Sequence, residues 1–169
     1  MKLTTVCYIR HEGKVLMLHR IKKKIDINQG KWIGVGGKME PGESPFECVL
    51  REVWEETGLR LLQPQLGCMV TFQFLDPDPA LTDWDTEYMF AFTCDQFEGT
   101  LKSDCPEGEL RWIPEDKLGQ LSLWPGDPLF LEPLLAGRPF FSLKIVYRGD
   151  ALVRWSYESA GASEGRLTP

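Results

Sequence analysis

The chain has 169 residues, of which 43% are hydrophobic, and this is enough to build the core of one catalytic domain. Its net charge of −6 argues against a protein that holds DNA or RNA polymers, because such proteins use a basic surface to displace counterions. No stretch approaches the roughly 20 apolar residues of a membrane span, and residues 1–3 lead directly into an expected strand rather than a signal peptide. We therefore expect a soluble, cytoplasmic protein whose partner is a small molecule.

The cysteines give no sign of a zinc site or a redox centre. They are odd in number, widely spaced and without a CxxC pair. We interpret them as reduced core and surface residues: Cys7, Cys48, Cys68, Cys94 and Cys105.

The first predicted elements are two strands at residues 4–10 and 14–19, which are apolar and rich in β-branched residues. The turn at 11–13 joins them as a hairpin. A polar connection at 20–31 follows and contains three consecutive lysines, which read as a solvated loop. A functional alternative is that Arg20 or one lysine contacts a substrate phosphate at the mouth of a site.

Residues 37–59 combine the end of a glycine-rich loop with a strongly marked helix start. Ser44 can cap the free N–H groups, Pro45 suits the first helical position, and Glu47 completes a capping box. The pattern predicts a helix over 45–57. We expect one face of this helix to be buried against a sheet, with the residues Phe46, Val49, Leu50, Val53 and Thr57.

Another face of the same helix gathers three glutamates, Glu52, Glu55 and Glu56. Like charges three and four residues apart destabilise a helix by a few tenths of a kcal/mol each. A bound divalent cation would offset that repulsion. The alternative is an ordinary solvated helix face that ends at Gly58.

After the helix, apolar runs predict strands, and an acidic, proline-containing segment at 76–85 predicts a loop that could cover a pocket. Strands are expected at 67–75, 88–94, 110–113, 140–147 and 151–157, helical segments at 114–118 and 129–136, and a frayed tail at 159–169.

The spacing of the fixed residues in 37–59 resembles the Nudix box. The matching positions are Gly37, Glu43, Arg51, Glu52, the aliphatic Val53, Glu55, Glu56, Gly58 and the aliphatic Leu59. The resemblance implies an α/β (α+β) Nudix fold, a mixed β-sheet sandwiched between helices, in a single domain over 1–158. It also implies hydrolysis of a pyrophosphate linkage in a nucleoside diphosphate derivative, with Mg²⁺, or Mn²⁺ as a substitute. Oxygen-only ligands suit such hard cations.

The resemblance assigns metal ligation to Glu52 and Glu56, with Glu55 as a further ligand and the carbonyl of Gly37 completing the coordination. It makes Glu52 the first candidate for the general base.

In such boxes Arg51 orients the glutamates through a salt bridge with Glu43, so both are expected to support the reaction without reacting. Many relatives add a glutamate from a distant loop to the metal site. Glu107 and Glu109 are the two choices here, and we prefer Glu109 because it directly precedes the strand at 110–113. The alternative is an ordinary acidic turn.

Further motifs resemble the MutT-type 8-oxo-dGTPases: Gly30-Lys31-Trp32 with Gly34, Gly36-Gly37-Lys38, Phe72-Gln73-Phe74, and Trp124-Pro125-Gly126-Asp127. The resemblance makes Trp124 and Phe72 walls around a purine and Asp127 a hydrogen-bonding partner of its edge, whereas plain core packing is the alternative for the two aromatic residues. The substrate-binding set is then Arg20, Trp32, Ile33, Gly36, Gly37, Lys38, Phe72, Trp124 and Asp127.

Two positions depart from the mammalian members of that group. Ile33 replaces a base-binding asparagine, and Gly126 replaces one of two adjacent aspartates. The leading hypothesis is hydrolysis of 8-oxo-dGTP or a related modified purine triphosphate to monophosphate and pyrophosphate, a DNA-repair role in nucleotide-pool sanitation. One alternative is a Nudix pyrophosphatase acting on ADP-ribose or a dinucleoside polyphosphate. Another is a non-catalytic nucleotide sensor, in which glutamates of the box would be replaced by other residues.

Overall fold

The computed structural model describes residues 1–80 and 84–159. The strands are β1 (Lys2–His11), β2 (Lys14–His19), β3 (Trp32–Ile33), β4 (Arg60–Leu62), β5 (Gln65–Leu75), β6 (Thr86–Cys94), β7 (Gln96–Glu98), β8 (Glu109–Pro114), β9 (Phe141–Arg148) and β10 (Ala151–Ser159). The helices are α1 (Pro45–Thr57), α2 (Asp127–Leu135) and the 3₁₀ helix η1 (Glu115–Gln120).

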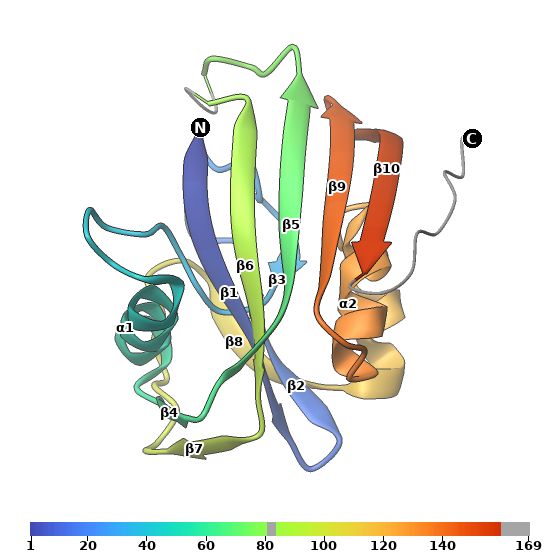
Figure 1. The fold of residues 1–169 in the computed structure, drawn as a ribbon. Coiled ribbons are helices and arrows are strands. Elements are labelled where there is room, and N and C mark those ends of the chain that lie inside the picture. The colour runs from blue at the N-terminus through green and yellow to red at the C-terminus, as the bar shows by residue number, and fades with distance from the viewer. Residues whose placement is uncertain (81–83, 160–169) are drawn as a thin grey trace.

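The main sheet is mixed and follows the order β10-β9-β5-β6-β1-β2-β3, with β8 also paired to β2 (Figure 1). Strand β1 runs parallel to β6, and β5 runs parallel to β9. Strands β1 and β2 pair only next to their hairpin turn, so that β2 diverges and pairs with β3 and β8 instead. The divergence leaves the first half of β1 free to pair with the glycine-rich loop, through bridges from Thr4 to Lys38 and from Cys7 to Val35.

Helices cover both faces of the sheet. Val49 and Val53 of α1 pack with Cys7 and Phe92 in one buried cluster on one side. On the other side, α2 packs against β1, β5 and β9 in a second cluster that includes Phe130. The predicted mixed sheet between helices is confirmed, because alternate residues of each strand supply the two cores.

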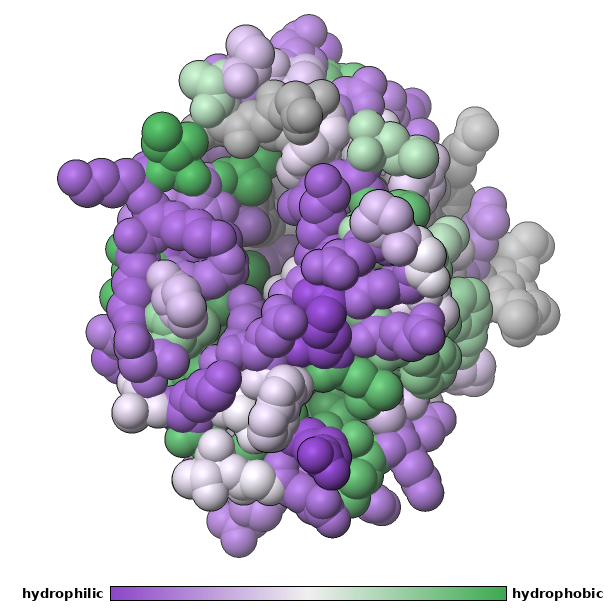
Figure 2. All heavy atoms as spheres, turned by 90° about the vertical axis from the view of Figure 1, so that its left-hand side faces the viewer, coloured by the Kyte–Doolittle hydropathy of each residue, from purple (hydrophilic) through white to green (hydrophobic). Residues whose placement is uncertain are grey.

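Helix α1 begins as predicted, but its buried face is turned from the predicted one. Ser44 and Glu47 form a complete capping box, and Gly58 ends the helix in the left-handed region. Phe46 and Leu50 are 46% and 40% exposed, so the prediction that both are buried is wrong. The buried residues are Cys48, Val49, Val53, Glu56 and Thr57. This rotation of the helix buries Glu56, and the apolar Phe46 and Leu50 remain exposed on a face of the molecule that is largely hydrophilic (Figure 2).

The later elements agree with the prediction in type and differ at their ends. Helix α2 begins at Asp127 rather than at residue 129, because Pro128 is well suited to a first helical turn. Strands β4 and β7 were not predicted, since three residues are too few to show alternation. The tail at 160–169 lies outside the described residues.

All five cysteines are free and buried, so the expectation that some lie on the surface is wrong. Among residues 1–80 and 84–159, no helix combines the length and apolarity needed to cross a membrane.

Candidate active site

A cavity of about 440 Å³ lies where the glycine-rich loop, α1 and α2 meet the sheet. Charged residues from α1, from the segment after β2 and from the turn before β8 line one part of it, and aromatic residues from β5, β9 and α2 line another. A cavity of this size and mixed lining is typical of a small-molecule site.

The glycine-rich loop lies flat against β1. Thr5 donates its backbone N–H to the carbonyl of Gly37 at 2.9 Å. A Cβ on Gly36 would lie 2.1 Å from the carbonyl oxygen of Thr5, and a Cβ on Gly37 would lie 2.4 Å from the carboxyl of Glu52. Both glycines are therefore required for the close approach of this loop to β1 and to α1.

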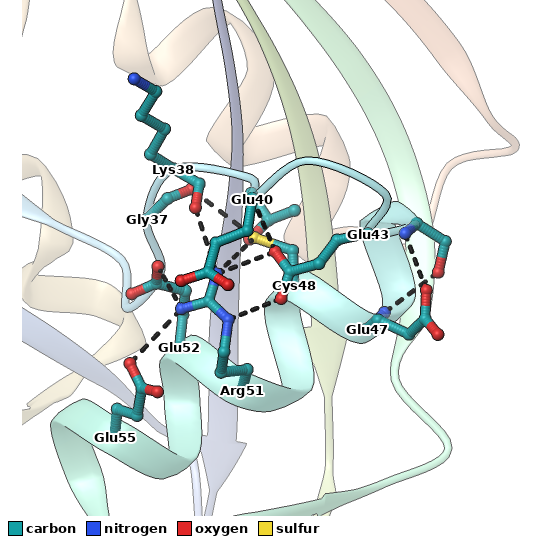
Figure 3. Close-up of polar contacts among 11 residues, drawn as sticks. Gly37, Lys38, Glu40, Glu43, Glu47, Cys48, Arg51, Glu52 and Glu55 are labelled. Atoms are coloured by element: carbon teal, nitrogen blue, oxygen red, sulfur yellow. Dashed lines mark hydrogen bonds and ion pairs between the residues drawn. The ribbon is translucent and has the colours of Figure 1, made fainter.

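Arg51 holds the acidic residues of the loop and helix in place (Figure 3). Its guanidinium donates to both carboxylate oxygens of Glu43, at 2.6 and 2.9 Å, and to Glu52 at 2.8 Å. It also reaches the exposed Glu55 at 3.3 Å. The hydrogen bonds from Arg51 lower the pKa of Glu43 to about 2. The bidentate pair with Glu43 orients the guanidinium of Arg51. The hydrogen bond from Arg51 to Glu52 then fixes the carboxylate of Glu52 at the cavity wall.

Glu56 is a buried carboxyl beside Glu52. Burial first, and the charge of Glu52 second, raise the pKa of Glu56 to about 7. The backbone N–H of Gly36 donates to Glu56 at 3.3 Å and partly counters that rise. Two carboxyl groups held together at a cavity wall repel each other unless a proton or a cation lies between them.

The donor set at this wall suits a hard divalent cation. Glu52, Glu56 and Gly37 all line the cavity and offer only oxygen atoms. Within the described ranges, no three acidic, histidine or cysteine side chains converge on one point. Mg²⁺ commonly binds one or two protein carboxylates and takes its remaining ligands from water and substrate, so two carboxylates suffice.

Four cavity residues form an ion-pair network beside Glu56. Arg20 donates to Asp26 at 2.7 Å and pairs with Glu107, which also pairs with Lys23. The positive charges of Arg20 and Lys23 reach Glu56 and lower its pKa against the effects of burial. This end of the cavity therefore carries cations within reach of a bound anion.

The aromatic end is formed around Trp124. The indole N–H of Trp124 donates to Asn28 at 2.8 Å, and its ring meets Tyr147 edge to face at 5.3 Å. Phe72 stacks on Tyr147 at 6.4 Å. These contacts hold Trp124 and Phe72 in the cavity wall, so each is a packed residue that also faces the cavity.

Asp127 is a buried acid at this aromatic end. Burial raises its pKa to about 7, while the backbone N–H of Trp124, which donates to its carboxylate at 3.1 Å, and Lys31 act in the opposite direction. Asp127 can therefore donate or accept a hydrogen bond near neutral pH.

The model of the NUDIX domain matches residues 2–134, which is most of the chain. The chain belongs to the Nudix hydrolase family. It is 35% identical over 134 residues to a Bacillus subtilis protein named as the uncharacterized Nudix hydrolase YvcI, with 79% of each chain covered. It is 29% identical over 141 residues to the oxidized purine nucleoside triphosphate hydrolase of Danio rerio, with 82% of this chain and 83% of that one covered.

The Nudix fold is also seen in a solved structure. A MutT protein from Bacillus halodurans superposes with a TM-score of 0.82 at 28% sequence identity, and the match covers 94% of this chain and 98% of that one. The chain thus belongs to a family of hydrolases of nucleoside diphosphate derivatives.

The structure brings most of the residues predicted from the Nudix box and the MutT motifs to one cavity. Its lining includes Arg20, Ile33, Gly36, Gly37, Lys38, Glu52, Glu56, Phe72, Trp124 and Asp127. Arg51 and Glu43 do not line the cavity, and Arg51 pairs with both Glu43 and Glu52.

Three further predicted residues lie outside the cavity. Trp32 stacks on His19 at 4.4 Å and is not part of the lining. Glu55 is 57% exposed and turned to Arg51. Glu109 pairs with Arg111, two residues along on the same face of β8, because alternate side chains of a strand share a face.

Glu107, the choice that was not preferred, lines the cavity instead. It lies in the turn before β8, where Gly108 packs so tightly on the carbonyl of His19 that a Cβ would come within 1.8 Å. The turn is thereby held over the end of β2, and this directs Glu107 towards Arg20. Nothing in the local spacing could separate Glu107 from Glu109.

Sequence reasoning also missed a group of polar residues at the N-terminal end of β1. Lys2, Thr4 and Glu87 line the same cavity. The signal available in the sequence was Glu87 itself, the one charged residue of a largely apolar strand, but its neighbours depend on the pairing of β1 with β6.

Proposed function

We propose that this protein hydrolyses a modified purine nucleoside triphosphate, with 8-oxo-dGTP as the leading candidate, to the monophosphate and pyrophosphate. The observation that carries the proposal is the cavity itself, which joins the paired carboxylates of the Nudix box to an aromatic pocket closed by an acid. Trp124 and Phe72 offer ring faces to a base, and Asp127 offers a hydrogen bond to its edge.

In this proposal, Glu52, Glu56 and the carbonyl of Gly37 hold Mg²⁺. The bound cation would neutralise charge on the phosphoryl oxygens and lower the proton affinity of water. Glu52 accepts the proton of the attacking water, and Arg51 keeps its carboxylate oriented through the 2.8 Å hydrogen bond. The cations Arg20, Lys23 and Lys38 bind the phosphate groups.

One of the named relatives supports a purine triphosphate as the substrate. The Danio rerio relative is named as an oxidized purine nucleoside triphosphate hydrolase, and its similarity extends over 82% of this chain. Ile33 lines the cavity and can pack against a base without a hydrogen bond. The proposal therefore places hydrogen-bonding selectivity elsewhere in the cavity.

The test is a comparison of kcat/KM with Mg²⁺ across 8-oxo-dGTP, dGTP, dATP, dCTP, ADP-ribose and a dinucleoside polyphosphate, with phosphate and pyrophosphate measured separately. We expect the highest value for 8-oxo-dGTP, with release of pyrophosphate. Highest turnover of ADP-ribose or the dinucleoside would contradict the proposed substrate. Removal of metal with EDTA should abolish turnover and excess Mg²⁺ should restore it; turnover that survives EDTA would contradict the metal assignment.

A further inference from the structure

Glu87 is a carboxylate built into the floor of the cavity. It lies on β6, in register with Lys2 of β1 on one side and with Phe72 of β5 on the other. Its side chain is 15% exposed and lines the cavity together with Phe72 and Met89. Directly paired residues on neighbouring strands point to the same face, so a ring that stacks on Phe72 would present an edge to Glu87.

The protein satisfies only part of the hydrogen-bonding capacity of Glu87. The hydroxyl of Thr4 donates to Oε1 at 2.6 Å. The ammonium of Lys2 is 3.6 Å from Oε2, which is an ion pair but longer than a hydrogen bond, and it also lies 4.7 Å from the ring centre of Trp84. Among the described residues, no group donates a hydrogen bond to Oε2. A carboxylate in this state can accept donors from a ligand.

The distance between Glu87 and the charged end of the cavity suits the length of a nucleotide. Gly36 packs against Thr5 and Val6 of β1, whereas Glu87 is paired with Lys2. At about 3.3 Å per residue, these positions are separated by roughly 10 to 13 Å along the strand. This is comparable to the length of a purine nucleoside with its first phosphate. A phosphate held near Gly36 therefore allows the base to reach Glu87.

We propose that Glu87 is a specificity-determining residue that reads the amino-bearing edge of a guanine-type base, a role that rests on the proposed function of this cavity. The ring N–H and the exocyclic amino group of guanine are adjacent donors, and one carboxylate can accept both. Oxidation at C8 leaves this edge unchanged. Lys2 and Thr4 position the carboxylate, and Ile33 leaves the recognition of this edge to Glu87.

The experiment uses a pair of ligands that differ only in the exocyclic amino group, dGMP and dIMP. Their dissociation constants are measured by calorimetry for the wild type, for Glu87→Gln and for the exposed control Glu98→Gln on β7. The wild type and the control should bind dGMP about tenfold or more tightly than dIMP, because the site is built to accept a hydrogen bond that dIMP lacks. In Glu87→Gln the two affinities should become nearly equal, because one acceptor becomes a donor. An unchanged ratio would overturn the proposal.

A second variant separates recognition from a simple ion pair. Lys2→Met removes the ammonium and keeps the carboxylate, so the preference for dGMP should persist. Loss of that preference in Lys2→Met would mean that the ion pair between Lys2 and Glu87, and not the hydrogen-bond acceptor of Glu87, determines the preference for dGMP. Because the readout is binding of monophosphates, it is independent of turnover. Failure of the proposed function would be seen as absent triphosphate hydrolysis, whereas failure of this inference would be seen as equal binding of dGMP and dIMP by the wild type.

Discussion

At the scale of single residues, Glu52 and Glu55 are three positions apart on α1 and have different surroundings. Glu52 lines the cavity and Glu55 is exposed. Glu52→Gln should lower kcat by about a thousandfold, because a general base contributes a factor of this order. Glu55→Gln is the matched control and should cause a much smaller loss. Steady-state kinetics, with calorimetric binding of the product monophosphate to confirm an intact site, would check both. Equal losses in the two variants would contradict the placement of Glu55 outside the cavity.

Asp127 illustrates how a single buried acid links stability to pH. Its pKa in the folded protein is raised to about 7, so the folded state holds a proton that the unfolded state releases near pH 4. The free energy of unfolding should therefore fall as the pH rises from about 4 to about 7, by at most about 4 kcal/mol from this group. Asp127→Asn should remove that part of the slope.

Urea unfolding at several pH values would measure this effect, with Asp150→Asn in the exposed turn between β9 and β10 as the control. If the slope in Asp127→Asn equals the wild-type slope, ionisation of Asp127 does not lower the free energy of unfolding.

The same variant should also change the preference among purine substrates more than it changes turnover of a generic nucleotide. A uniform loss on every substrate would assign Asp127 a structural role.

At the scale of elements, the contact between the glycine-rich loop and α1 decides the position of the catalytic carboxylate. A Cβ on Gly37 would lie 2.4 Å from the carboxyl of Glu52. Gly37→Ala should displace Glu52 and lower kcat by about tenfold or more, since misplacement by about 1 Å is costly in catalysis. The matched control is Gly119→Ala in η1, where nothing lies within 4 Å of the new methyl group.

Kinetics and thermal unfolding of both glycine variants would check this prediction. Gly119→Ala should match the wild type in both measurements. Wild-type kcat in Gly37→Ala would mean that Glu52 can move aside without loss of function, against the fixed orientation that Arg51 imposes.

At the scale of the whole molecule, the site depends on a strand beyond the residues matched by the family model, which end at 134. Tyr147 on β9 stacks on Phe72, meets Trp124 edge to face, and accepts a hydrogen bond from the buried backbone N–H of Gly126 at 2.9 Å. The C-terminal hairpin thus supports the aromatic end of the cavity.

Tyr147→Phe should lower the free energy of unfolding by about 1 to 3 kcal/mol, because the N–H of Gly126 is left buried without an acceptor. It should also weaken nucleotide binding, because the turn that carries Trp124 is then less well held. Urea unfolding and monophosphate calorimetry would check both effects against Tyr157→Phe on β10. Unchanged stability would indicate that the N–H of Gly126 finds another partner.

The sequence by itself determined the features that depend on local spacing. The capping box, the extent of α1 and the pattern of glutamates are all set within 23 consecutive positions, 37–59, where helix geometry relates one residue to the next. The same spacing predicted the Nudix family and the cavity residues Gly37, Glu52 and Glu56. The negative charge of the catalytic end of the cavity also follows from the sequence, because the Nudix box itself contains the acidic residues.

Only the tertiary structure decided which residues from distant segments share the cavity. Glu87 lies beside Lys2, 85 positions away in the sequence, because β1 and β6 pair in parallel. Glu107 rather than Glu109 faces Arg20 because the turn packs on β2, and α1 buries Glu56 while Leu50 stays exposed. Strand register and helix rotation are set by the packing of whole elements, and a local pattern contains no information about either.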